Sequence, residues 1–203
     1  MHTARTLRLL IVIGFAAFAS LRAAPVDEAR TALVAGIDEV SAALNSNPDR
    51  KDFINVLDTL VDKHFAFATT TRLSVGPAWR DLTTEQQTRL TTLFGQLVIR
   101  TYADRVTGQT RPEIIYGKPL ELKPGRIEIP TTTKTGGQTY SVAYRLELVP
   151  ASNPARWRVY DVIGEGVSLI ANYRSQFEPI LEKSGPQGLM KTLETKLADA
   201  TAR

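Results

Sequence analysis

Three side chains in this sequence are of types that carry out acid–base chemistry: His64, Asp161 and Glu165. Two carboxylates at the end of a predicted strand could act as a general acid and base beside a cleft. Such catalysis needs other titratable groups that converge on the same point, and the sequence supplies few of them. We therefore predict that both carboxylates are structural. Glu165 would stabilise the N-terminus of the following helix. Asp161 would pair with Arg100 or Arg174.

Other catalytic and metal-binding groups are scarce. The chain has no cysteine, which excludes disulfides, thiol catalysis and cysteine-ligated metals. Zinc sites need several converging ligands, so His64, which stands beside Phe65 and Phe67, is interpreted as a packed or capping side chain. No Gly-x-Ser-x-Gly motif supports a serine nucleophile. We predict no catalytic residue, no metal and no cofactor, and hence no enzymatic activity.

The first 23 residues have the pattern of a cleavable secretory signal peptide. Arg5 and Arg8 precede an apolar run, Leu9–Leu21, and Ala23 is the expected last residue before cleavage. A membrane-spanning helix needs roughly 20 apolar residues, which is more than this run provides. We predict export to the periplasm and a single mature domain, residues 24–203.

The signal peptide also accounts for the basic composition. The formal net charge of the whole chain is +4, and three arginines (Arg5, Arg8 and Arg22) precede the expected cleavage site, which leaves +1 for the mature chain. A nearly neutral chain with no later run of Lys or Arg gives no electrostatic argument for binding nucleic acid.

The order of the predicted elements indicates an α+β fold. Helical periodicity appears in six stretches: 26–44, 49–61, 65–75, 83–105, 167–182 and 186–200. Between Pro112 and Gly164 the apolar period changes to two, which predicts four strands around 114–116, 127–129, 140–148 and 157–163. Short turns between these strands favour antiparallel pairing. We predict an antiparallel sheet of about four strands, covered by N- and C-terminal helices with an apolar pocket between them.

Six short motifs follow one another along the mature chain in the order found in a known family. They are 75–79 (VGPAW), 83–86 (TTEQ), 100–103 (RTYA), 140–144 (YSVAY), 157–168 (WRVYDVIGEGVS) and 172–177 (NYRSQF). In these motifs the chain resembles the MlaC family, periplasmic phospholipid-binding proteins of Gram-negative bacteria that include the toluene-tolerance proteins. The chain departs from the family at Lys63–Ala66, where members commonly have Pro-x-Phe-Asp.

The resemblance implies a soluble, non-catalytic, monomeric carrier that takes part in Mla-type lipid asymmetry. Its expected partners are phospholipid, an inner-membrane ABC-transporter complex and an outer-membrane lipoprotein complex. A carrier of hopanoids or other isoprenoid lipids is an alternative that the resemblance also permits. Two alternatives belong to other functional classes: a secreted α+β enzyme, and an envelope scaffold that binds no lipid.

A carrier of diacyl lipid must enclose the tails almost completely. Two sixteen-carbon chains exposed to water would cost more than ~20 kcal/mol, so the pocket must be deep and apolar. The predicted lining residues are Trp79, Phe94, Leu97, Val98, Tyr102, Val142, Tyr144, Leu146, Val167, Ile170, Tyr173 and Phe177. Each of these residues alone has the spacing of ordinary core positions, so the prediction concerns the set.

Overall fold

The structure is a computed structural model that describes residues 25–46, 50–106, 112–150 and 156–201. The predicted signal peptide, residues 1–23, lies outside the described residues and stays a prediction. In chain order the elements are α1 (Pro25–Ser46), α2 (Arg50–His64), α3 (Phe67–Val75), the 3-10 helix η1 (Gly76–Asp81), α4 (Thr84–Val106), β1 (Glu113–Tyr116), β2 (Leu120–Lys123), β3 (Arg126–Thr135), β4 (Gln138–Val149), β5 (Arg156–Gly164), β6 (Val167–Ser168) and α5 (Leu169–Thr201).

The strands form one antiparallel sheet of six strands in the order β1-β3-β4-β5-β6, with β2 also paired to β3. The predicted α+β class is therefore confirmed, with two strands more than the sequence predicts. Both additional strands are short. The sequence of β2, LELK, alternates over only four residues, all of them exposed, and β6 has only two residues, so neither is long enough to be recognised from its period alone.

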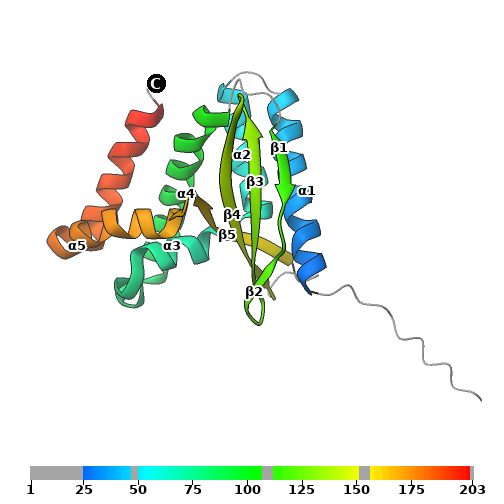
Figure 1. The fold of residues 1–203 in the computed structure, drawn as a ribbon. Helices are drawn as coiled ribbons and strands as arrows, with labels where there is room; N and C mark the ends of the chain where they lie inside the picture. The colour runs from blue at the N-terminus through cyan, green and yellow to red at the C-terminus, as the bar shows by residue number, and fades with distance from the viewer. Residues whose placement is uncertain (1–24, 47–49, 107–111, 151–155, 202–203) are drawn as a thin grey trace, which may run out of the picture.

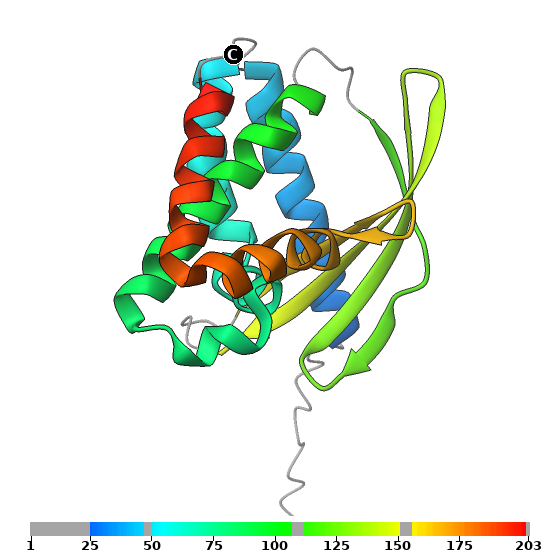
Figure 2. The ribbon, with the colours of Figure 1, turned by 90° about the vertical axis from the view of Figure 1, so that its left-hand side faces the viewer.

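The two faces of the sheet have different surroundings (Figure 1). On one face, apolar side chains of β3, β4 and β5 pack against α1 through Leu33. The opposite face is polar: Arg126 pairs with Glu147 at 2.8 Å and Arg145 pairs with Glu128 at 2.8 Å. The β3–β4 hairpin curves away from the helices in Figure 2. One face of the sheet is thus left to α1 as its main helical cover.

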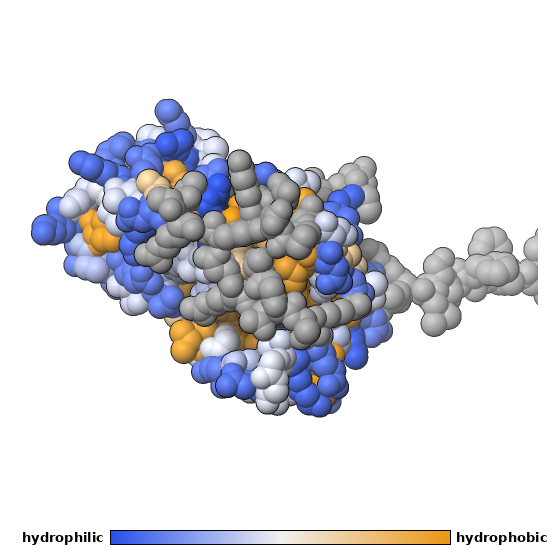
Figure 3. Space-filling view, turned by 90° about the horizontal axis from the view of Figure 1, so that it is seen from above, coloured by the Kyte–Doolittle hydropathy of each residue, from blue (hydrophilic) through white to orange (hydrophobic). Residues whose placement is uncertain are grey.

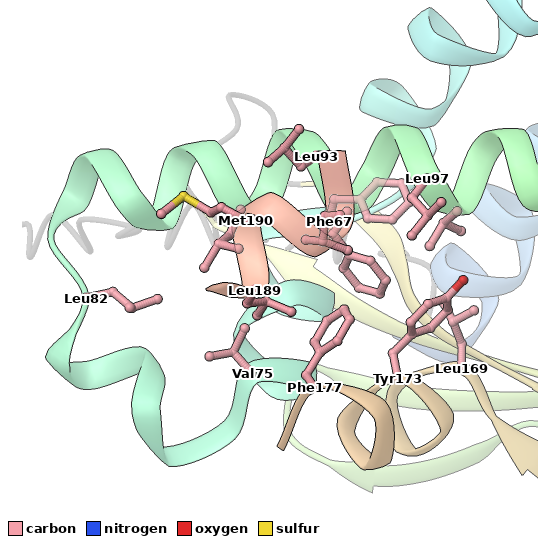
Figure 4. Packing of buried hydrophobic residues seen from close by; sticks show 14 residues of the cluster. Phe67, Val75, Leu82, Leu93, Leu97, Leu169, Tyr173, Phe177, Leu189 and Met190 are labelled. Atoms are coloured by element: carbon pink, nitrogen blue, oxygen red, sulfur yellow. The ribbon is translucent and has the colours of Figure 1, made fainter. Parts of the chain in front are cut away.

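The remaining helices build a core of their own. Buried side chains of α3, α4 and α5 form an apolar cluster, which we call the helical cluster (Figure 4). At its centre the Phe94 ring is fully buried and lies 4.7 Å from the ring of Tyr173 and 5.2 Å from that of Phe177. Edge-to-face contacts at these distances are favourable between aromatic rings. The helical cluster therefore holds α5 against α3 and α4.

The connection between α2 and α3 is bound to the sheet by its backbone. Phe65 forms a parallel bridge with Val159 of β5, and the Ala66 N–H donates to the Val159 carbonyl at 2.7 Å. These contacts lie where the chain departs from the common MlaC motif. They link the helical cluster to the α1 side of the sheet.

The turn after β5 differs in detail from the sequence-based prediction. Residues 164–166 form a hairpin turn in which Glu165 and Gly166 have φ of 49° and 80°. Val167 and Ser168 then pair with β5 as β6, so α5 begins at Leu169 and not near Val167. The predicted break between the last two helices falls at Gly185, whose φ of 63° kinks α5.

A buried carboxylate fixes the corner between the sheet and α5. Asp161 is 1% exposed, and its Oδ1 and Oδ2 accept hydrogen bonds from the Ile170 N–H at 3.1 Å and from Ser168 Oγ at 2.7 Å. Ser168 Oγ accepts in turn from the Ala171 N–H at 3.1 Å. Two of the N–H groups that a helix leaves unpaired in its first turn are satisfied in this way.

The ionic partners at this corner correct two expectations. The cation nearest to Asp161 is Arg145, with Nη1 at 3.5 Å from Oδ2, and neither Arg100 nor Arg174 makes the expected pair. Glu165 accepts from the backbone N–H of Ser141 at 2.6 Å. It therefore stabilises the strand hairpin and not the start of the helix, because β6 separates it from α5.

Replacing Asp161 by alanine should destabilise the protein by about 3 kcal/mol, because the Ser168 hydroxyl and the Ile170 N–H lose a charged acceptor while buried. Urea unfolding measures the loss. The same change at the exposed Asp81 should stay within about 0.5 kcal/mol of wild type. Equal losses in the two variants would contradict the capping role.

Candidate functional site

An apolar cavity of about 290 Å³ lies between α1, the end of α2 and the face of the sheet that α1 covers. Its wall consists mainly of apolar side chains from five elements. Those that the argument below uses are Leu33, Ile37, Val40, Tyr144, Leu146 and Trp157. The wall also includes Leu44, in the last turn of α1, and Pro112, just before β1. The C-terminal end of α1 is at the top in Figure 1. Hydrophobic residues are exposed on this upper side of the molecule (Figure 3).

Two polar side chains in the wall come from the sheet. Burial raises the pKa of the Tyr144 phenol to about 12, and nearby Tyr116 adds to the rise. Trp157 is 6% exposed, and its Nε1 is buried with no hydrogen-bond partner within the described parts of the chain. The sheet side of the mainly apolar wall therefore contains an un-ionised hydroxyl and an indole whose N–H has no acceptor in the described part of the chain.

At the helical side of the cavity, an ionic cluster joins α1 to α2. Glu39 accepts from Lys63 Nζ at 2.7 Å, and its Oε2 lies 2.9 Å from His64 Nε2. The hydrogen bond with His64, followed by that with Lys63, lowers the pKa of Glu39. His64 also lines the cavity. A Cβ at Gly36 would lie 3.1 Å from the His64 ring, so the glycine lets the two helices approach closely.

The structure places the sequence-predicted lining residues in two separate regions. Of the predicted set, Tyr144 and Leu146 line the cavity. Six others pack in or against the helical cluster: Trp79, Phe94, Leu97, Val98, Tyr173 and Phe177. The remaining four are outside the lining that the described residues form: Tyr102, Val142, Val167 and Ile170. Val167 is 60% exposed.

The helix that contributes most to the wall is α1, which the sequence-based set omits. Leu33, Ile37 and Val40 form the apolar stripe that the sequence shows between residues 26 and 44. The stripe predicts a buried face, but nothing in its spacing says which layer it will cover. Small residues within this helix, Ala32 and Gly36, are also part of the wall. In the sequence, these two small residues indicate that this face of α1 packs differently from that of an ordinary core helix.

Neither a metal site nor a membrane span emerges from the residues that are described. No group of three or more His, Asp or Glu side chains among them is arranged to hold a metal ion. None of the described helices is both long and apolar enough to cross a membrane.

Comparison with known proteins identifies the family. The family model described as MlaC protein matches residues 35–195. The chain belongs to the MlaC family. This confirms the predicted family and the prediction of a lipid-binding protein that is not an enzyme. MlaC proteins are periplasmic.

A solved structure resembles this MlaC chain closely. It is the phospholipid-binding protein from Ralstonia solanacearum, in complex with a phospholipid. The TM-score is 0.76 and the sequence identity 26%, over 86% of this chain and 99% of the other. No curated protein matches the chain.

The raised pKa of Tyr144 has a measurable consequence at alkaline pH. The phenol should titrate near pH 12 in the folded protein and near pH 10 when unfolded. A folded-state pKa above the unfolded value favours the folded state below pH ~10, and this contribution is lost as the pH rises from there towards 12. Tyr144→Phe should therefore lose less stability than wild type over this interval, as measured by urea unfolding.

Ultraviolet absorbance gives an independent reading of the same group. The absorbance step at the highest pH should come from Tyr144. This step should be missing in Tyr144→Phe and present in Tyr140→Phe, which makes the same change at an exposed position on β4. If Tyr144→Phe left the late step in place, the phenol would not be in an apolar wall.

Proposed function

We propose that the protein is a periplasmic carrier that holds the acyl chains of a phospholipid in the cavity between α1 and the sheet. The observation that carries the proposal is the cavity itself, whose wall is apolar on the α1 side and on the sheet side. The similar Ralstonia solanacearum protein, which was solved with a phospholipid, supports the choice of ligand. Burying the tails here would remove their large hydration cost, and the headgroup would stay in water.

The cavity must widen to hold two acyl chains. Its volume of about 290 Å³ is at the lower limit of the ~300–1,000 Å³ typical of ligand pockets, and two sixteen-carbon chains are bulkier than a drug-sized ligand. Of the two helices around the cavity, α2 is followed by backbone contacts to β5 at Phe65 and Ala66, so α1 is the one that can move without breaking them. We infer that α1 shifts outward on loading, and that the acyl chains replace its lost apolar contacts.

Membership in the MlaC family supports a transport role. We propose that the chain is exported by a cleaved signal peptide and acts as a monomer. It would exchange phospholipid with an inner-membrane ABC-transporter complex and an outer-membrane lipoprotein complex. A movable α1 suits this role, because a partner that competes for the apolar face of α1 would release the cargo.

Lipid content tests the proposal directly. Protein purified without detergent should carry one phospholipid per chain by native mass spectrometry. Val40→Arg puts a charge into the cavity wall and should abolish retention, because an unpaired charge in an apolar site is costly. Val167→Arg, the same change at an exposed position, should retain the lipid.

Two results would contradict this proposal. Wild-type protein that is empty and takes no lipid from liposomes is not a carrier. Loss of lipid from Val167→Arg with retention in Val40→Arg would move the site to the α5 side, where the sequence-based set of residues is centred.

Movement of α1 can be tested with an engineered disulfide. A Cβ at Gly36 would lie 3.4 Å from the Cβ of His64, close to the spacing of a disulfide, and the chain has no other cysteine. In Gly36→Cys/His64→Cys, oxidation should slow lipid exchange with liposomes by about tenfold or more, as expected for a locked lid, and reduction should restore it. The Gly36→Cys single variant is the control. Equal exchange rates in the two redox states would show that α1 and α2 need not separate.

A further inference from the structure

The indole of Trp157 lines the cavity, and its buried N–H has no acceptor in the described part of the protein. The side chain is 6% exposed and forms part of the cavity wall, and its Nε1 has no partner among the described residues. Buried tryptophans usually find an acceptor for this N–H, since an unpaired buried donor is costly. Four other buried polar atoms also lack partners, but none of their residues lines the cavity: Ser74 Oγ, Thr133 Oγ1, Thr135 Oγ1 and Arg158 Nε.

The surroundings of Trp157 explain why the protein does not supply an acceptor. Trp157 lies opposite Leu148 in the β4–β5 ladder, whose carbonyls serve the pairing of the strands. Its neighbours in the buried cluster include Leu33 of α1 and Leu146 of β4, both apolar. An indole N–H is a donor only. Because Nε1 is buried in this structure, an acceptor oxygen of a bound molecule would reach it when α1 shifts outward and the cavity widens.

We propose that Trp157 Nε1–H donates a hydrogen bond to a carbonyl oxygen of the bound lipid, so that the cavity selects acyl lipids. This inference rests on the proposed function. An ester carbonyl at the root of a phospholipid tail and the carboxyl of a free fatty acid share the required chemistry. A hydrocarbon isoprenoid has no acceptor and would leave the donor unpaired, and the ether oxygen of an ether-linked chain is a weaker acceptor than a carbonyl. The indole thus discriminates against the hopanoid alternative.

A comparison of ester-linked and ether-linked lipids isolates this one contact. Wild-type protein is exchanged against liposomes that contain equal amounts of diacyl and dialkyl-ether phosphatidylcholine with tails of the same length. Native mass spectrometry then gives the ratio of the two bound species. One neutral hydrogen bond should favour the diacyl lipid about three- to tenfold.

The two tryptophans of the chain provide a matched pair of variants. Trp157→Phe keeps an aromatic ring but removes the N–H, and should bring the ratio of bound diacyl to bound ether lipid close to unity. Trp79→Phe makes the same change in a residue that packs against the helical cluster, and should keep the wild-type preference. A preference that survives in Trp157→Phe would overturn the proposal.

Magnetic resonance tests the contact without altering Trp157. In ¹⁵N-tryptophan-labelled Trp79→Phe, the only remaining indole N–H signal belongs to Trp157. It should shift downfield on loading with diacyl lipid and less with the ether lipid. An equal shift with both lipids would show that water, or another group, accepts the bond, and would overturn the proposal.

The outcomes separate this inference from the function on which it rests. Equal binding of ester and ether lipids would overturn selection by Trp157 and leave the carrier intact, whereas failure to take up either lipid would overturn the carrier itself. A third liposome preparation with added palmitic acid distinguishes the source of the carbonyl. Preferential uptake of the fatty acid would assign the site to a free carboxyl, and preferential uptake of the diacyl lipid to the ester.

Discussion

The buried carboxylate of Asp161 is the contact on which the arrangement of layers depends. It accepts hydrogen bonds from the first turn of α5 and from the hydroxyl of Ser168. These bonds set the direction in which the chain leaves the sheet. From that corner α5 runs towards α3 and α4, where Tyr173 and Phe177 close around Phe94. Because α5 is committed to this cluster, the apolar face of the sheet is covered mainly by α1. A single helix leaves space over part of this face, and that space is the cavity.

The two apolar regions have different mechanical properties. In the helical cluster, aromatic rings interlock among three helices (Figure 4), and removing any one ring would leave a void that neighbours cannot fill. Around the cavity, aliphatic side chains such as Ile37 and Val40 already lack some protein neighbours, so displacing them costs less free energy than displacing a ring of the helical cluster. The proposed carrier function would use both regions: one to keep the fold intact whether loaded or empty, and one to open for the lipid.

Sequence patterns predicted the fold class and the order of most elements. The period-two pattern of residues 140–148 and the interruption between residues 182 and 186 reflect local constraints, and the structure has β4 and the kink at Gly185 there. The location of the cavity depends instead on which helix covers which face. Phe94 and Leu33 both lie on apolar faces of predicted helices, yet one is at the centre of a closed core and the other beside an open space. That difference arises from tertiary packing, which helical periodicity does not record.

The backbone contact between Phe65 and Val159 also bears on which substitutions the tether between the two halves of the domain tolerates. The bridge and the Ala66 N–H bond are made by main-chain atoms that every residue except proline can supply. Substitutions at Phe65 and Ala66, proline excepted, therefore keep the hydrogen-bonding atoms of this tether. The side chain of the neighbouring His64 is then available for a separate contact, which it makes with Glu39.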